Sequence, residues 1–296
     1  MNGVINVLKP SGMTSFDVVG YLRSVLKIKK IGHTGTLDPA AVGVLPICIG
    51  KATKAIEYLI DKNKVYRTEM ILGVSTDTQD ATGNVIKRSV VNVSCEDIEK
   101  ALESFIGKYD QIPPMYSAVK VNGKKLYQLA RKGISVERQS RQVEVFFIDV
   151  LHIKGNTVIF DVGCSKGTYI RTLCSDVGDI LGCGGHMSFL LRKESGVFGL
   201  DTALTLEEID MLASKGCLHE KIIPIEELFK DYNKITLNKL DTKRFMNGVK
   251  IVIDSKYIGI CQSLKVYGDD GAFIALGETY ENKDNDVVLK LKKFFS

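Results

Sequence analysis

The clearest pattern in the chain is the alternation from Val65 to Leu72, where every second residue falls on one face. Side chains two positions apart lie on the same side of a strand, so this segment predicts a strand whose mostly apolar face carries Tyr66. Other apolar runs predict strands at Gly3–Leu8, Leu45–Ile49, Val143–Ile153 and Thr157–Gly163. Gly155-Asn156 separates the last two, and this turn signal predicts that they pair.

Apolar residues three or four positions apart predict helices elsewhere in the chain. Thr14 or Ser15 can cap a helix that runs to about Lys27. The same spacing predicts helices at Ala52–Ile60, Ser94–Ile106 and Thr168–Leu181. Because helices and strands follow one another without a regular βαβ order, we expect an α/β (α+β) fold built on a mixed sheet rather than a doubly wound one.

The character of the sequence changes near residue 231. From there, short apolar runs at Lys250–Ile253, Tyr257–Cys261 and Ala272–Leu276 are separated by glycines, which is typical of a small β-rich domain. A chain of 296 residues is long enough for one large domain with a smaller one beside it. We therefore predict two domains, residues 1–230 and residues 231–296.

The composition is that of a soluble globular protein, with 45% apolar and 25% charged residues. No apolar stretch is long enough to span a membrane, and the first residues lack the pattern of a secretory leader. The seven cysteines are scattered without a CxxC spacing, which favours reduced thiols in a cytoplasmic protein. Cys183 and His186 offer two metal ligands, but no second pair follows at a matching distance, so we expect no metal site.

Charge changes this picture, because the net charge of +5 on the whole chain equals the net charge of one window, residues 115–144. Tyr116 and Tyr127 lie among the cations of this window. A basic surface with interleaved aromatic rings suits a polyanion with exposed bases, and a solvated basic face would explain the charge equally well. The cations are Lys120, Lys124, Lys125, Arg131, Lys132, Arg138 and Arg141.

Candidate chemistry centres on GHTGTLDPAAVGVLPICIGKATK, residues 32–54, in which Asp38 is the one carboxylate. The segment is not a phosphate loop, because its glycine spacing is wrong and no Ser or Thr follows the lysine. Asp38 followed by Pro39 can be the N-cap of a helix. The surrounding glycines, and the effect of a proline on the residue before it, favour an extended turn that presents the carboxylate as a nucleophile or general base.

Three residues besides Asp38 are candidates for the site, and each also has a purely structural interpretation. Arg171 falls off the apolar stripe of its predicted helix and lies in the first turn, where the helix dipole disfavours a cation. A carboxylate partner would explain this position, and so would a plain surface arginine. Tyr66 can be a core residue or a pocket wall that stacks on a flat ring. His33, taken alone, is best interpreted as a capping or core histidine.

Six segments in order carry a resemblance to a known family: KPSGMTS from Lys9, the Gly32 segment quoted above, KVYR from Lys64, PPMYSAVKVNGKKLYQLARKG from Pro113, SKGTYIRTLCSDVG from Ser165 and LLRKESGVF from Leu190. They resemble the signature segments of the TruB family, the bacterial tRNA pseudouridine-55 synthases. The matches run from about residue 4 to residue 198, and GHTGTLDP is the most specific of them. The remainder resembles the small RNA-binding PUA domain that many members carry.

This resemblance implies a pseudouridine-synthase fold, with a mixed, largely antiparallel central sheet flanked by helices and a PUA-like C-terminal domain. It implies an isomerase without a cofactor, which detaches uracil from C1′ of uridine 55 in the T-loop of tRNA, turns it and rejoins it through C5. The uridine would have to be flipped out of the folded loop. The partner would be the tRNA T-arm, held by the basic window, with neither a membrane nor an obligate protein partner.

The resemblance also implies roles for single residues. Asp38 would be the nucleophile, and Arg171 would pair with it and keep it ionised. Tyr66 would stack on the uracil and handle a proton, and His33 would fill the place of the extruded nucleotide. Leu190 would line the apolar wall of the pocket, and Lys9 would serve packing or phosphate contact.

Two other functions stay open at this point. A non-catalytic RNA-binding protein could keep the fold without needing Asp38. A phosphatase-like hydrolase could use an aspartyl intermediate, but such enzymes commonly need a second nearby acid and a magnesium ion. The residues after Asp38, Pro39-Ala40-Ala41, supply no such partner.

Overall fold

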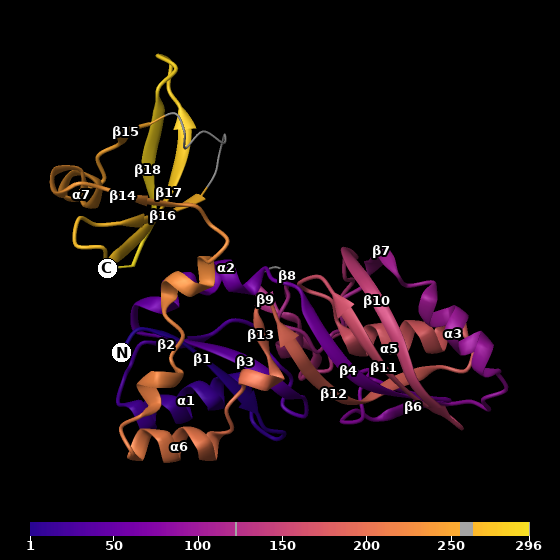
Figure 1. The fold of residues 1–296 in the computed structure, drawn as a ribbon. Coiled ribbons are helices and arrows are strands. Elements are labelled where there is room, and N and C mark those ends of the chain that lie inside the picture. Colours follow the sequence, from indigo (N-terminus) through magenta and orange to yellow (C-terminus); the bar gives the residue numbers. More distant parts are fainter. Residues whose placement is uncertain (122, 255–262, 296) are drawn as a thin grey trace.

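The computed structural model describes residues 1–121, 123–254 and 263–295. Its main element is a nine-stranded sheet with the strand order β1-β3-β12-β4-β11-β10-β7, to which β13 and β2 add at β12 and β3 (Figure 1). Within it β12 runs parallel to β3, and the other pairs are antiparallel. The predicted mixed, largely antiparallel sheet is therefore confirmed. The strands are β1 Gly3–Lys9, β2 Ile31–His33, β3 Val42–Ile49, β4 Lys64–Leu72, β7 Gly107–Gln111, β10 Arg141–Lys154, β11 Thr157–Cys164, β12 Gly185–Ser195 and β13 Phe198–Gly199.

Strand β4 lies at the centre of this sheet, between β12 and β11. Its even-numbered residues from Lys64 to Leu72 are buried and its odd-numbered ones are partly exposed, as the alternation predicts. On the partly exposed face Arg67 pairs with Asp161 of β11 at 2.8 Å. The register of β4 therefore places Tyr66 on the inner face of the sheet.

The junction of β3 and β12 depends on a glycine. Gly43 has φ +115°, and a Cβ there would lie 2.3 Å from the carbonyl oxygen of Arg192. Only glycine tolerates both this conformation and this approach. The close approach brings the strand that follows Asp38 against the strand that carries Leu190.

The helices cover the sheet in two groups (Figure 1). Helices α3 and α5 enclose a core with β4, β10 and β11, and helices α1 and α6 enclose another with β1 and β3. Thr14 and Ser94 cap α1 and α3 through capping boxes with Asp17 and Asp97. The helices are α1 Ser15–Leu26, α2 Ile56–Ile60, α3 Cys95–Glu103, α4 Leu126–Ala130, α5 Ile170–Ile180, α6 Leu206–Ser214 and α7 Lys239–Met246, with 3-10 turns η1 Gly50–Ala55, η2 Leu200–Thr202, η3 Leu218–Lys221 and η4 Ile225–Phe229.

The predicted helices exist, but their ends differ from the prediction. The helix expected at Ala52–Ile60 begins as the 3-10 turn η1 and becomes α-helical only in α2. Helix α5 starts two residues later than expected, because Tyr169 is still extended at φ −98° and ψ 108°. Helix α3 ends at Glu103 instead of Ile106, where the chain turns into β7.

A second, five-stranded sheet with the order β14-β16-β17-β18-β15 follows residue 230. It has its own core, which includes Phe245, Val266 and Leu289. This confirms a small β-rich C-terminal domain, while the boundary at residue 230 and the PUA-like identity stay predictions. The strand predicted at Tyr257–Cys261 lies outside the described residues. The strands are β14 Lys234–Thr236, β15 Ile251–Ile253, β16 Ser263–Tyr267, β17 Phe273–Glu281 and β18 Val287–Phe294.

The described residues also form two small hairpins: β5 Val74–Thr76 with β6 Val85–Arg88, and β8 Lys120–Val121 with β9 Lys124–Lys125. Among the described residues, no helix is both long and apolar enough to cross a membrane. The cysteines in this part of the chain are free. A cytoplasmic location stays a prediction.

Candidate active site

Asp38 lies in the loop between β2 and β3. No helix begins there, so the N-cap interpretation is wrong: the Asp38 carbonyl accepts a hydrogen bond from the Ala41 amide at 3.1 Å and closes a turn, after which the chain enters β3. Hydrogen bonds from two sides hold the loop, since the Ser15 hydroxyl accepts from the Leu37 amide at 2.8 Å and Gly12 donates to the Pro39 carbonyl at 2.8 Å. The acid is thus presented from a braced turn.

Arg171 reaches this turn from the first turn of α5. Its Nη2 lies 3.2 Å from Oδ2 of Asp38, and the exposed fractions of the two side chains are 7% and 39%. The surface interpretation of Arg171 is therefore wrong, and the carboxylate partner that its position suggested is present. The same Nη2 donates to the Tyr116 carbonyl at 2.7 Å, which ties the basic window to the arginine.

A second carboxylate, which the sequence analysis missed, contacts the same guanidinium. Nη1 of Arg171 lies 3.4 Å from Oδ2 of Asp80, whose side chain is 12% exposed. The other oxygen of Asp80 accepts from the Thr82 amide at 2.9 Å and the Thr78 hydroxyl at 2.8 Å. The only signal in the sequence is the run TDTQDATG, which is typical of a turn and does not point to residue 171.

Asp80 is the second acid that an aspartyl hydrolase such as a phosphatase would need. The residues next to Asp38 in the sequence include no second acid, which weighed against a phosphatase. In the fold, however, Arg171 contacts both Asp38 and Asp80. No group of three or more His, Cys, Asp or Glu side chains that could hold a metal ion occurs in the part of the chain described. Within it, the Cys183 sulfur bonds to the Gly184 carbonyl and His186 Nδ1 lies 2.8 Å from the Val74 carbonyl.

The charges around Asp38 oppose each other. Burial raises the pKa of this carboxyl, the positive charge of Arg171 lowers it, the nearby negative charge of Asp80 raises it and Lys9 lowers it. Burial prevails, so the pKa lies above its usual range. The site thus combines an acid of raised proton affinity with an arginine that orients its ionised form.

Tyr66 and Leu190 line the inside of the site from neighbouring strands. Tyr66 is 9% exposed and Leu190 is 8% exposed, and both belong to one apolar cluster with Leu37 of the Asp38 loop. Burial raises the pKa of the Tyr66 hydroxyl, so it is a phenol at neutral pH. The two residues offer an apolar wall and a flat ring close to the acid.

His33 and Lys9 lie at the edge of the loop. The Gly35 amide donates to Nδ1 of His33 at 3.3 Å, and burial, followed by the charge of Arg192, lowers the pKa of the imidazole. Lys9 is fully buried, and its ammonium donates to the carbonyls of Pro10, Met13 and Pro39 at 2.7, 2.6 and 3.1 Å. These bonds use all three protons, so the geometry favours packing over phosphate contact for Lys9.

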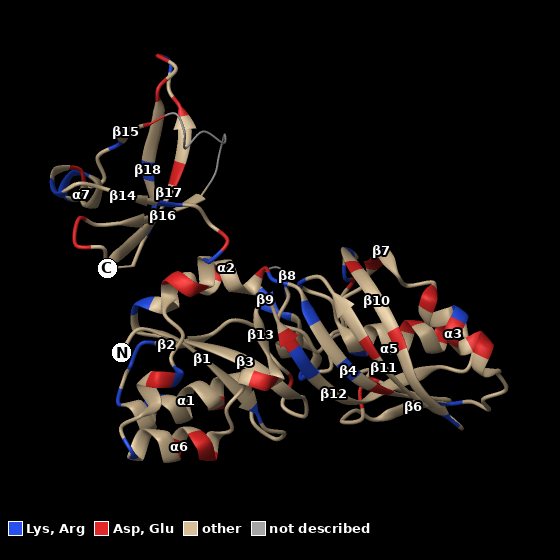
Figure 2. Ribbon diagram, in the orientation of Figure 1, with Lys and Arg blue, Asp and Glu red and all other residues tan. Residues whose placement is uncertain are grey.

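The basic window lies mainly in an insertion between β7 and β10, and Figure 2 shows blue segments of the ribbon, which mark Lys and Arg, near β8 and β9. The insertion contributes no ion pair within the described chain, and five of its seven cations are exposed. Lys125 and Arg131 lie 5.6 and 5.5 Å from the Tyr127 ring centre. Free cations around an aromatic ring suit a polyanion with bases.

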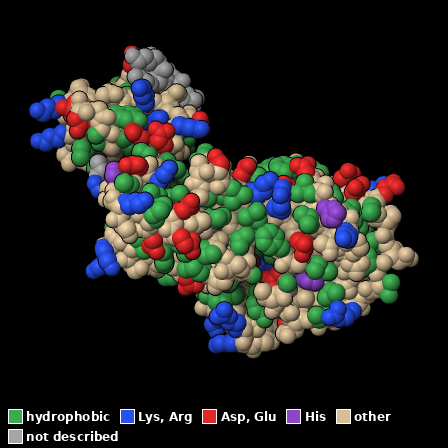
Figure 3. All heavy atoms as spheres, turned by 60° about the horizontal axis from the view of Figure 1, so that its bottom comes forward, with side chains coloured by type: hydrophobic (Ala, Val, Ile, Leu, Met, Phe, Trp, Pro, Cys, Tyr) green, Lys and Arg blue, Asp and Glu red, His purple; other side chains and the backbone are tan. Residues whose placement is uncertain are grey.

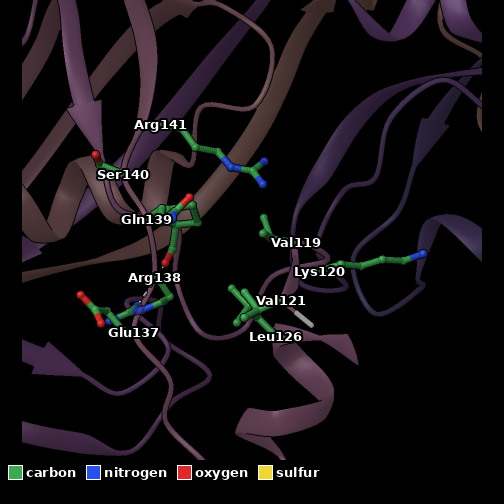
Figure 4. A pocket seen from close by; sticks show the side chains of 10 residues that line it. Val119, Lys120, Val121, Leu126, Glu137, Arg138, Gln139, Ser140 and Arg141 are labelled. Carbon is green, nitrogen blue, oxygen red and sulfur yellow. Dashed lines mark hydrogen bonds between the residues drawn. The ribbon is translucent and has the colours of Figure 1, made fainter. Parts of the chain in front are cut away.

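A pocket of about 440 Å³ opens within the insertion. Val119, Lys120, Val121 and Leu126 lie on one side of it, and the returning segment 137–141 lies on the other (Figure 4). Arg138 anchors that segment by donating to the Pro113 carbonyl at 3.1 Å. On the face that Figure 3 presents, apolar and charged side chains are mixed, and Lys and Arg gather mainly at projecting edges.

Comparison with known proteins finds family models and relatives that match this chain. The model of the TruB family pseudouridylate synthase (N terminal domain) matches residues 23–170, and that of the tRNA pseudouridylate synthase B C-terminal domain matches residues 171–230. The tRNA pseudouridine synthase B of Alkaliphilus oremlandii (strain OhILAs) is 47% identical and aligns over 98% of this chain and 97% of its own. That of Clostridioides difficile (strain 630) is 45% identical over 100% of both chains.

Two solved structures are similar over nearly the whole chain. A Cbf5–Nop10–Gar1 complex matches with a TM-score of 0.75 and 28% identity, covering 99% of this chain and 85% of the other. An H/ACA RNP bound to a substrate RNA containing 2′-deoxyuridine matches with a TM-score of 0.73 and 26% identity, again over 99% and 85%.

Proposed function

Because the chain belongs to the TruB family of pseudouridylate synthases, we propose that it acts on uridine 55 in the T-loop of tRNA, with Asp38 as its nucleophile. The reaction class follows from the family: the protein is an isomerase that converts uridine in tRNA to pseudouridine. The position of the uridine and the roles of single residues are our proposal.

The contact between Asp38 and Arg171 carries this proposal. Breaking the N1–C1′ bond develops positive charge on the sugar, and a carboxylate beside C1′ can trap or stabilise that charge. Asp38 is 39% exposed, so a nucleotide can reach it, while the buried guanidinium holds its orientation. Tyr66 then stacks on the uracil, and Leu190 packs against it.

The insertion supports a folded RNA as the substrate. Extracting a uridine from a folded loop costs a few kcal/mol, which interactions elsewhere on the RNA must offset. Exposed cations next to Tyr127 can bind the phosphates and bases of the T-arm. Because Tyr116 of this insertion bonds to Arg171, the surface that holds the RNA adjoins the surface that reacts.

The rival hydrolase has one observation in its favour, the second acid. Asp80, however, is nearly enclosed, and three groups satisfy its Oδ1. Its remaining oxygen faces Arg171, which is a poor neighbour for a metal ion. The geometry supports Asp80 as a partner of the arginine rather than as a magnesium ligand.

The experiment is to incubate an unmodified tRNA transcript with the protein alone and to map pseudouridine before and after. We expect pseudouridine at position 55, and we expect Asp38→Asn to lower its rate of formation by about 10³-fold or more while tRNA binding stays close to that of the parent. The matched control is Asp179→Asn, which changes an exposed acid of α5 and should leave the rate unchanged. Normal turnover by Asp38→Asn would refute the nucleophile, and modification at another uridine would refute the position.

A further inference from the structure

A buried cation without an acidic partner lies behind the proposed active site. Arg192 of β12 is 1% exposed and is the largest of the fully buried side chains described. It lies directly opposite Tyr66 of β4 in the antiparallel pair and opposite Gly43 of β3 in the parallel pair. No pattern in the sequence points to a role for this residue.

Backbone carbonyls, not carboxylates, hold this guanidinium. Nε donates to the Val44 carbonyl at 2.6 Å and Nη2 donates to the Gly35 carbonyl at 3.3 Å. Among the described residues no Asp or Glu forms an ion pair with it. Carbonyls fix the position of the group and leave its positive charge uncancelled.

The other charged groups around it are mostly cationic. Arg192 interacts electrostatically with Lys9 of β1, Lys64 of β4 and His33 of β2. Burial lowers the pKa of Lys9 to about 8 and that of Lys64 to about 8, and the charge of Arg192 contributes to both shifts. Burying an unpaired charge costs free energy. The buried Arg192 therefore suggests that an anion forms nearby.

The reaction supplies such an anion at Tyr66. In the isomerisation the N1–C1′ bond breaks, the C5–C1′ bond forms, C5 loses a proton and N1 gains one. A phenol can carry this proton: it gives its own to N1, and as a phenolate it takes the proton from C5. Atoms and charge then balance without another reagent, but the phenolate must exist within a buried site.

We propose that Arg192 is a positioning residue of this reaction, whose uncancelled charge stabilises the Tyr66 phenolate during the proton transfer. The inference rests on the proposed function, in which Tyr66 handles the proton. Arg192 acts through Tyr66 and does not itself touch the RNA in this account.

Three ionisable groups of the neighbouring elements act on the Tyr66 hydroxyl: Arg192 of β12, Cys164 of β11 and Asp38 of its loop. Burial raises the pKa of the hydroxyl, Arg192 lowers it through its charge and a hydrogen bond, and negative charge on Cys164 or Asp38 raises it. Burial raises the pKa of Cys164 itself to about 11, so this thiol is neutral when the enzyme works. Arg192 is the group that favours the phenolate.

The direct test titrates residue 66. The tyrosine is replaced by 3-fluorotyrosine, and its fluorine resonance is followed against pH in the otherwise native protein, in Arg192→Gln and in Arg192→Lys. We expect the pKa of the phenol to be higher by about 1 or more in Arg192→Gln, and nearer to that of the parent in Arg192→Lys, which keeps the charge. The control is Lys193→Gln, the next residue along the strand, whose side chain pairs with Asp161 at 2.7 Å.

A kinetic cycle gives a second test that a merely structural role would not pass. Under single-turnover conditions Arg192→Gln should lower the rate of pseudouridine formation about tenfold with little change in the concentration that gives the half-maximal rate, and Arg192→Lys should lower it less. Both effects should vanish in a Tyr66→Phe background. An unchanged phenol pKa in the folded Arg192→Gln protein, or equal rate losses in both backgrounds, would overturn the inference. Failure of the proposed function is seen separately, because the parent protein would then form no pseudouridine at position 55 while the titration would still report on Arg192.

Discussion

Arg171 governs the charge of the proposed site because its guanidinium touches two acids in different surroundings. Asp38 is 39% exposed, while Asp80 is 12% exposed and accepts hydrogen bonds from the hydroxyls of Thr78 and Thr82. A fork-shaped guanidinium can hold both carboxylates, and a lysine could not do so with the same geometry. Both acids therefore share one guanidinium, and the negative charge of Asp80 raises the pKa of Asp38.

The pH dependence of the reaction should report this arrangement. Asp38 must be ionised to act on C1′, and burial raises its pKa, so activity should fall on acidification at a pH above the usual range of an aspartate. Removing the negative charge in Asp80→Asn should move this acid limb to lower pH, because the charge of Asp80 raises the pKa of Asp38. Removing the positive charge in Arg171→Gln should move it to higher pH. Single-turnover rates between about pH 5 and 8 would measure both shifts.

The raised pKa of Asp38 also affects the stability of the fold. A carboxyl whose pKa is raised in the folded state stabilises the fold when it is protonated, and this contribution disappears as the pH rises through the folded pKa. Asp38→Asn should thus melt at a slightly higher temperature than the parent at neutral pH. A lower melting temperature for Asp38→Asn than for the parent would contradict this sign. Acid limbs that move in the same direction in Asp80→Asn and Arg171→Gln would contradict the predicted pH dependence.

The basic insertion is the element that joins binding to the site. It departs from β7 and returns at β10, and between them the Tyr116 carbonyl accepts from Arg171 at 2.7 Å. Its hairpin and helix α4 present Lys124, Lys125 and Arg131 around Tyr127. An element that carries most of its charge unpaired should act mainly through electrostatics with a polyanion.

Neutralising that charge should weaken tRNA binding in a salt-dependent way. For Lys124→Gln, Lys125→Gln and Arg131→Gln together, we expect the slope of log K against log salt concentration to flatten by up to about 1 for each phosphate that the variant no longer neutralises. Filter binding at several salt concentrations would measure it. The matched control replaces Lys87, Arg88 and Lys154, which are exposed and lie outside the insertion. Equal slopes in both triple variants would make the insertion an ordinary solvated face.

At the scale of the whole molecule, an aromatic cluster joins the two sheets. Phe229 lies 5.5 Å from the Tyr58 ring of α2 and 5.9 Å from the Phe295 ring beyond β18. Lys293 pairs with Glu57 in the same region, and Lys54 donates to the Phe294 carbonyl at 2.8 Å. The C-terminal domain is thereby attached next to the segment that follows β3.

Removing the central ring should loosen this attachment. Phe229 is 3% exposed, and Phe229→Ala should lower stability by about 3–5 kcal/mol. Because this ring packs between the two domains, calorimetry of the variant should resolve two unfolding transitions instead of one cooperative transition. Phe16→Ala, at a phenylalanine that is 65% exposed on α1, should change little. A single transition of unchanged midpoint in Phe229→Ala would show that the cluster does not hold the domains together.

The prediction from sequence was strongest where structure is local. The alternation in β4, the cap of α1 and the hairpin of β10 and β11 depend on residues close together in the chain, and each is found as expected. Helix starts were less certain, as η1 and α5 show, since neighbouring elements decide where the first turn forms.

By itself the sequence determined the strand and helix pattern, the mixed sheet, the family motifs and the candidate acid in a glycine-rich turn. Only the tertiary structure decided which groups surround that acid. Arg171 meets Asp38 and Asp80 across 133 and 91 residues, Lys9 is fully buried, and Arg192 lies opposite Tyr66 without an acid. Such pairings depend on how strands and loops far apart in the chain pack together. A local pattern of polar and apolar residues does not specify these long-range contacts.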